Sequence, residues 1–159
     1  MSCATLAASA LLWLASSGVA PIPAAPAVQS APVSVAAEPL FADIVRRASA
    51  LKARAEVYRK GLGADPAAPA AALTDLAVFQ GQIGELAALD MKGHVTLKER
   101  GAVDDLKCIL RGISQDLPDK LAAMTAATTV KDQDLALRDM VYLLNDNVEV
   151  ITAPPTPPA

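Results

Sequence analysis

The chain has 159 residues, a formal net charge of −3 at pH 7, and a composition that is 53% hydrophobic but only 3% aromatic. This length allows one domain with one modest core, and the small net charge excludes the strongly basic composition typical of nucleic-acid-binding proteins. Alanine supplies much of the apolar content, and because alanine is the best helix former and a poor strand former, the composition favours an all-α fold.

The N-terminal segment is apolar, and no charged residue precedes Glu38. The stretch from Ala4 to Ala20 has 17 residues without a charge, which is short for a membrane span of roughly 20 strongly apolar residues. A secretory signal needs an apolar centre of only about 7–15 residues, followed by small residues at the cleavage site. Both Ala25-Pro26-Ala27 and Val35-Ala36-Ala37 supply small residues at that spacing.

We therefore predict a signal peptide at residues 1–27, a Pro/Ala-rich linker at 28–37, a helical bundle at 38–152 and a Pro-rich tail at 153–159. The lysine or arginine that usually precedes the apolar centre is missing, so an uncleaved anchor and a disordered leader remain alternatives. A membrane contact is expected only if the N-terminal segment is not cleaved.

The first predicted helix begins near Pro39 and ends near Gly61, because proline suits a first helical turn and glycine suits a helix end. Its apolar residues recur at alternating steps of three and four, which places them on one face of a helix. They are Phe41, Ile44, Ala48, Leu51, Ala55, Tyr58 and Leu62.

The second predicted helix has Asp65 as its N-cap, Pro66 in its first turn and Gly93 at its end. Its apolar face is formed by Ala72, Leu76, Phe79, Ile83 and Leu86. Gly81 and Gly84 cost this helix about 1 kcal/mol each relative to alanine, so they predict a close approach by a neighbouring helix or by a partner chain.

The third predicted helix begins at Thr96, which has the spacing of a capping box with Glu99. It is expected to break near Pro118, because a proline inside a helix removes one hydrogen bond, and Asp116 would cap a short continuation. The fourth helix begins between Thr129 and Asp132. The apolar faces of the last two helices are Val103, Leu106, Leu110, Ile113 and Leu117, and Leu137, Val141, Leu144, Val148 and Ile151.

Four amphipathic helices joined by short connections predict an antiparallel up-down-up-down four-helix bundle whose third helix is broken near Pro118. No catalytic residues are expected, since no nucleophile, base and orienting group can be assembled. His94 has no co-ligands at metal-binding spacing, so we predict an exposed turn histidine and no metal site. Neither a haem nor another cofactor is assigned, because Met91, Met124 and Met140 cannot be paired with an inward-facing histidine.

Two surface features carry functional hypotheses. Cys108 falls opposite the apolar face of its helix, so in an oxidising compartment it could form an intermolecular disulfide. The first helix is basic, and its side chains flanking the apolar face predict a surface for an anionic partner such as a lipid headgroup or wall polymer, with simple cover of the helix seam as the alternative. These residues are Arg47, Lys52, Arg54 and Arg59.

Together these features predict a small exported bundle that acts as a non-enzymatic interaction or scaffold module in the bacterial periplasm or cell envelope, or is secreted. Its expected partner is an unknown protein, an envelope component or a second copy of the chain. A nucleic-acid partner is not expected. The alternative is a carrier that binds a small ligand or a haem-like cofactor between the helices.

Overall fold

A computed structural model describes residues 34–102 and 105–153 of the chain. The predicted signal peptide, most of the linker and nearly all of the tail lie outside the described residues. Four helices are present: α1 (Pro39–Lys60), α2 (Leu76–Glu99), α3 (Leu106–Ala126) and α4 (Val130–Thr152). The described part of the chain contains no strand beyond an isolated bridge between Pro69 and Thr129. The predicted all-α bundle of four helices is therefore confirmed.

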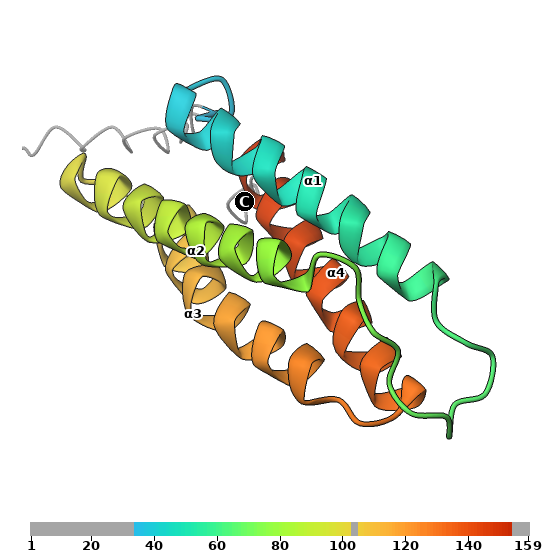
Figure 1. Cartoon of the computed structure of the whole chain (residues 1–159). Coiled ribbons are helices and arrows are strands. Elements are labelled where there is room, and N and C mark those ends of the chain that lie inside the picture. Colours follow the sequence, from blue (N-terminus) through green and yellow to red (C-terminus); the bar gives the residue numbers. More distant parts are fainter. Residues whose placement is uncertain (1–33, 103–104, 154–159) are drawn as a thin grey trace, which may run out of the picture. The chain divides into compact units, whose positions relative to one another are not determined.

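Each helix packs against two others, and Figure 1 shows α1 beside α4 and α2 beside α3. The remaining packed pairs are α3 with α4 and α1 with α2, so α2 lies diagonally opposite α4. Arg59 near the end of α1 pairs with Asp134 near the beginning of α4, whereas Lys52 donates to Asn145 further along α4. Contacts between α1 and α4 thus run in opposite directions along the two helices.

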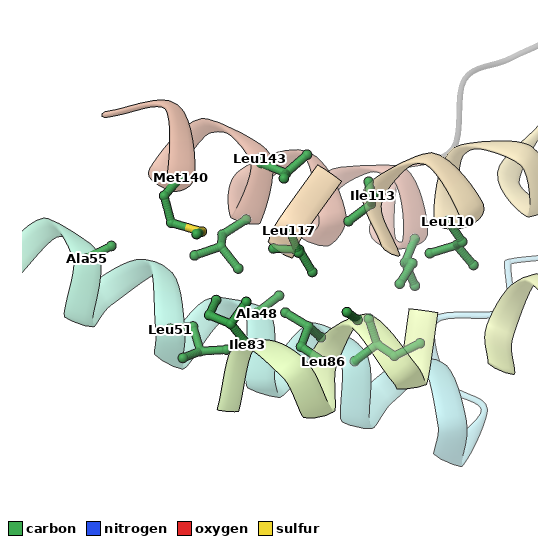
Figure 2. Close-up of a cluster of buried hydrophobic side chains, with 14 of the residues drawn as sticks. Ala48, Leu51, Ala55, Ile83, Leu86, Leu110, Ile113, Leu117, Met140 and Leu143 are labelled. Atoms are coloured by element: carbon green, nitrogen blue, oxygen red, sulfur yellow. The ribbon is translucent and has the colours of Figure 1, made fainter. Parts of the chain in front are cut away.

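The core lies where the four apolar faces meet, and Figure 2 shows side chains from all four helices directed toward one another. Burying a leucine, isoleucine or phenylalanine side chain stabilises a fold by about 1.5–3 kcal/mol, so these residues dominate the stability. The largest fully buried side chains are Phe41, Phe79, Ile44, Ile83, Leu86, Leu110, Leu117, Met124, Leu137, Met140, Leu144 and Ile151. The periodicity of each segment predicted most of them.

The second helix begins at Leu76 rather than near Asp65, so that boundary was wrong. Residues 61–75 instead form a long connection, in which Asp65 Oδ1 accepts a hydrogen bond from the amide of Ala67 at 2.9 Å and shapes a turn. Pro66 and Pro69 disfavour helical backbone in the residues that precede them. The connection reaches the beginning of α4, as Figure 1 shows.

The connection is held to α4 by a short set of backbone and side-chain hydrogen bonds. The amide of Ala70 donates to the Thr128 carbonyl at 3.0 Å, and the amide of Val130 donates to the Ala68 carbonyl at 2.9 Å. The buried Gln133 side chain both accepts from the Ala71 amide and donates to the Ala71 carbonyl, each at 2.8 Å. These hydrogen bonds satisfy backbone groups of the connection and hold it along a defined path despite its length.

The predicted end of the second helix at Gly93 was also wrong, because α2 continues to Glu99. A β-carbon at Gly93 would lie 3.1 Å from Leu110 Cδ1 and 3.4 Å from Phe41 Cε1. This glycine therefore allows neighbouring helices to approach α2, and the helix instead ends before Gly101, whose φ of 67° favours glycine. Residues 96–99 form the last turn of α2 and cap no helix.

The predicted break near Pro118 is not found, because α3 is one helix from Leu106 to Ala126 with Pro118 inside it. Leu117 and Met124, on either side of the proline, are both buried, and their burial offsets the lost hydrogen bond. The predicted start of α4 is confirmed: the Thr129 hydroxyl accepts from the Asp132 amide at 3.2 Å and donates to its carboxylate.

Candidate functional site

The four residues of the predicted anionic-partner surface are divided between two sides of α1. Lys52 and Arg59 face α4, where they bond to Asn145 and to Asp134. Arg47 and Arg54 face α2. The structure therefore does not bring all four charges together, and the two that face α2 belong to a different surface from the two that face α4.

The side facing α2 contains a groove with a volume of about 310 Å³. Three arginines and one glutamine amide surround a small apolar floor, which gives the groove both fork-shaped cationic donors and a surface for aliphatic groups. It is lined by Arg46, Arg47, Ala50, Leu51, Arg54 and Gln82. We call this the arginine groove.

A second hollow of about 360 Å³ adjoins the arginine groove, since Arg54 lines both. It lies between the end of α1 and the connection that precedes α2, and its lining includes Val57, Leu62 and Leu73. The side chain of Val57 is exposed despite its size. The α1–α2 side thus offers basic and apolar groups in a continuous surface.

Carboxylates at the edges of the arginine groove hold its arginines in place. Arg46 pairs with Asp43, Arg47 bonds to Asp43 at 3.0 Å and to Glu85 at 2.7 Å, and Arg54 pairs with Asp75 at 3.2 Å.

Although desolvation opposes it, hydrogen bonds from Arg47 and Arg46 lower the pKa of Asp43. Hydrogen bonds to Asp43 and then to Glu85 raise the pKa of Arg47, so both groups stay charged.

The close approach by a neighbouring helix predicted at Gly81 and Gly84 was wrong, whereas approach by a partner chain stays a prediction. Neither position has an atom within 4 Å of where a β-carbon would lie, and both are exposed. The glycine that a neighbour does approach is Gly93.

His94 does not lie at an exposed turn, because α2 includes it and its side chain is partly buried. Its Nδ1 lies 2.6 Å from the backbone oxygen of Lys107, where it links α2 to α3. Within residues 34–102 and 105–153, no group of three His, Cys, Asp or Glu side chains could hold a metal ion. Met124 and Met140 are buried in the core, whereas His94 is directed toward α3.

Cys108 is exposed on α3, as its phase predicted, and it is unpaired within the described part of the chain. The intermolecular disulfide itself stays a prediction.

One polar contact in the core escaped the sequence reasoning. Asp90 on α2 and Asn147 on α4 are both completely buried, and Asn147 Nδ2 donates to Asp90 Oδ2 at 2.7 Å. Asp90 follows Leu86 by four residues, and Asn147 follows Leu144 by three, so each lies in the apolar face of its helix. Polar residues at these two apolar positions were the available signal.

No family model, curated protein or solved structure matches the chain. Among the helices that the structure describes, none has the length and apolar character needed to cross a membrane. The site must therefore be interpreted from its own residues.

Proposed function

We propose that the chain is an exported, non-enzymatic interaction module that binds an acidic segment of a partner protein in the arginine groove. The observation that carries the proposal is the convergence of Arg46, Arg47 and Arg54 around the apolar floor formed by Ala50 and Leu51. Arginine guanidinium groups suit this role because each presents several donors in a rigid fork that matches a carboxylate.

The carboxylates already present at the groove do not oppose such binding strongly. Exposed ion pairs contribute only about 0–1 kcal/mol, so an incoming carboxylate can displace Asp43 or Glu85 at little cost. The side chain of Arg46 is 69% exposed, and among the described residues it forms an ion pair with Asp43 alone, one turn earlier on the same helix. It is therefore the arginine best placed to exchange partners.

A synthetic peptide of alternating glutamate and leucine is a direct probe for the arginine groove. Isothermal titration calorimetry with the full chain is expected to show binding that weakens as salt increases, because exposed charges are screened. Arg46→Gln should weaken binding by up to about fivefold, equivalent to about 1 kcal/mol, as expected for one exposed ion pair.

Arg138→Gln is the matched control for Arg46→Gln. Arg138 on α4 is 57% exposed and also pairs with a nearby aspartate, Asp139, but it lies outside the groove. Its replacement should leave affinity for the peptide unchanged. Equal losses in the two variants, or no binding by the parent, would contradict the proposal.

Photocrosslinking in the cells that make the protein extends the test to the natural partner. A photoreactive residue in place of Gln82, which lines the groove, should give a crosslinked product, whereas one in place of exposed Ala123 on α3 should not. Crosslinks of equal yield at both positions would count against a specific groove.

Export is part of the proposal, and cleavage after Ala27 fits the fold better than cleavage after Ala37. Val35 and Ala36 pack against the core, and the Glu38 amide donates to the Val35 carbonyl at 2.9 Å. Cleavage after Ala37 would remove both contacts. The intact mass of the native protein should therefore correspond to a chain that begins between about residues 21 and 34, from signal-peptide dimensions; a chain beginning at Met1 would exclude cleavage.

The carrier hypothesis has a simple separate test. A Soret band in the absorption spectrum of the native protein would favour haem binding between the helices over the interaction module, whereas a colourless protein is expected from the arginine groove proposal.

A further inference from the structure

The hydrogen bond between Asp90 and Asn147 joins two helices, α2 and α4, that do not pack directly on each other. α2 and α4 lie diagonally across the bundle, and each packs against α1 and α3. Both side chains have no exposed surface, and the Nδ2 to Oδ2 distance is 2.7 Å. The hydrogen bond therefore crosses the core and connects α2 to α4 directly.

This contact leaves two oxygens without a hydrogen-bond partner. Asp90 Oδ1 and Asn147 Oδ1 are both buried, and neither has a partner among the described residues. An ionised Asp90 has only acceptor oxygens, so neither Asp90 Oδ1 nor Asn147 Oδ1 receives a hydrogen bond from the other residue. A buried acceptor without a donor, and above all a buried charge without a counterion, is strongly unfavourable.

One proton on Asp90 removes both defects. A protonated carboxyl group has one O–H donor and one acceptor oxygen, and a primary amide has an N–H donor and a carbonyl acceptor. The two planar groups can then form two parallel hydrogen bonds: Asn147 Nδ2 donates to Asp90 Oδ2, and Asp90 Oδ1–H donates to Asn147 Oδ1. The pair is neutral in this state, as an apolar core requires.

Among the described residues, burial and the hydrogen bond from Asn147 act on the pKa of Asp90, and no neighbouring charge does. At the next turn of α2, Gly93 is in contact distance of Phe41 and Ile44 from α1 and of Leu110 from α3. The titratable groups nearest to this level on each helix are all at least partly exposed. They are Asp43 and Arg47 on α1, His94 on α2, Lys107 and Arg111 on α3, and Asp146 and Glu149 on α4.

We propose that Asp90 and Asn147 form a proton-dependent lock, in which one proton held between the carboxyl and the amide joins α2 to α4 and its release to solvent destabilises the bundle. This inference is independent of the arginine groove and of any partner.

The direction of the pH effect follows from burial. Desolvation raises the pKa of Asp90 from 3.8 to about 7, although the hydrogen bond from Asn147 acts in the opposite direction. Between pH 3.8 and about 7 the folded chain therefore retains a proton that the unfolded chain releases. The unfolding equilibrium constant should rise by about tenfold per pH unit in this window and level off above it.

The first experiment measures Asp90 directly in the unmodified full chain. The carboxyl ¹³C chemical shift of Asp90 is followed by NMR from pH 4 to pH 9. A transition near neutral pH is expected, and amide hydrogen exchange around Asn147, corrected for its intrinsic pH dependence, should accelerate above it. A transition near the ordinary value for aspartate would overturn the proposal, since water or another donor would then be satisfying an ionised group.

The second experiment uses Asp90→Asn, which keeps the shape of the side chain and supplies both an N–H donor and an acceptor oxygen at every pH. Chemical unfolding at successive pH values should show that the stability of this variant declines much less than that of the parent between pH 4 and pH 7. Asp116→Asn on the exposed face of α3 is the control, and it should retain the decline.

The difference between Asp90→Asn and Asp116→Asn isolates the contribution of Asp90, because both variants keep the other carboxylates with a raised pKa. Desolvation and then the charge of Glu149 raise the pKa of Asp146, which acts in the same direction as Asp90. If the stability of the parent and that of Asp90→Asn decline equally between pH 4 and pH 7, the proposed lock is wrong. If Asp90→Asn does not fold, the NMR titration of the unmodified chain still decides the question.

Discussion

Replacing Gln133 by alanine is expected to release the connection between α1 and α2 from the beginning of α4. The Gln133 side chain is 3% exposed, and its amide forms two hydrogen bonds of 2.8 Å to the backbone of Ala71, one as donor and one as acceptor. Alanine and glutamine have similar helix propensities, so the helix itself is little affected. The change therefore removes the clamp without removing the helix.

The magnitude follows from the two lost hydrogen bonds. Each contributes about 0.5–1.5 kcal/mol net, and Ala71 is only partly buried, so water can reach its backbone groups when the clamp is lost. We expect Gln133→Ala to lower the free energy of unfolding by about 2 kcal/mol. For a domain of this size that corresponds to a decrease in Tm of about 8 °C.

Urea unfolding measures the loss, and amide hydrogen exchange locates it. The Ala71 amide should exchange faster in Gln133→Ala, whereas amides in the middle of α2 should lose protection only in proportion to global stability. Gln115→Ala on the exposed face of α3 is the matched control, expected to change stability by less than about 0.5 kcal/mol. Equal stability of Gln133→Ala and the parent, or unchanged exchange at Ala71, would refute the clamp.

Four further substitutions test other parts of the fold. Gly81→Ala and Gly84→Ala should each stabilise the chain by about 1 kcal/mol in thermal unfolding, because the space around both is open; destabilisation would reveal a neighbour that contacts them. Pro118→Ala should restore a hydrogen bond to the Ser114 carbonyl and so increase the free energy of unfolding by up to about 3 kcal/mol, seen as a higher Tm; a lower Tm would show that α3 depends on the proline. Cys108→Ser should abolish a disulfide dimer on non-reducing gels with a change in stability below about 0.5 kcal/mol; a persistently monomeric parent would make the thiol incidental.

The apolar faces of the helices were predictable because they depend on one helix at a time. The steps of three and four from Phe41 to Tyr58 identify the buried face of α1, and the same logic placed Cys108 on the exposed face of α3. The cap at Thr129 is equally local, since its hydroxyl and the Asp132 amide are only three residues apart. These features need no knowledge of the neighbouring helices.

Glycine and proline were ambiguous because each has more than one physical use. Gly93 could end a helix or admit a close neighbour, and only the positions of Leu110 and Phe41 distinguish the two. Asp65 followed by proline could start a helix or a turn, and the choice depends on hydrogen bonds formed with α4, far along the chain. Pro118 likewise could break a helix or be accommodated inside one, and α3 continues through it because packing offsets the lost hydrogen bond.

The candidate sites were the least predictable part, since they depend on which helices become neighbours. Periodicity placed Arg47 and Arg59 beside the same apolar face, but the structure directs one toward Glu85 on α2 and the other toward Asp134 on α4.

The sequence by itself determined the helical class, most of the core and the exposed thiol, because a period of 3.6 residues per turn sets the faces of every helix independently. Tertiary structure alone decided that Asp90 meets Asn147, 57 residues away in the chain. A polar residue in an apolar face can be recognised from sequence. The partner that satisfies it is set by the packing of four faces at once, and that packing is a property of the whole bundle.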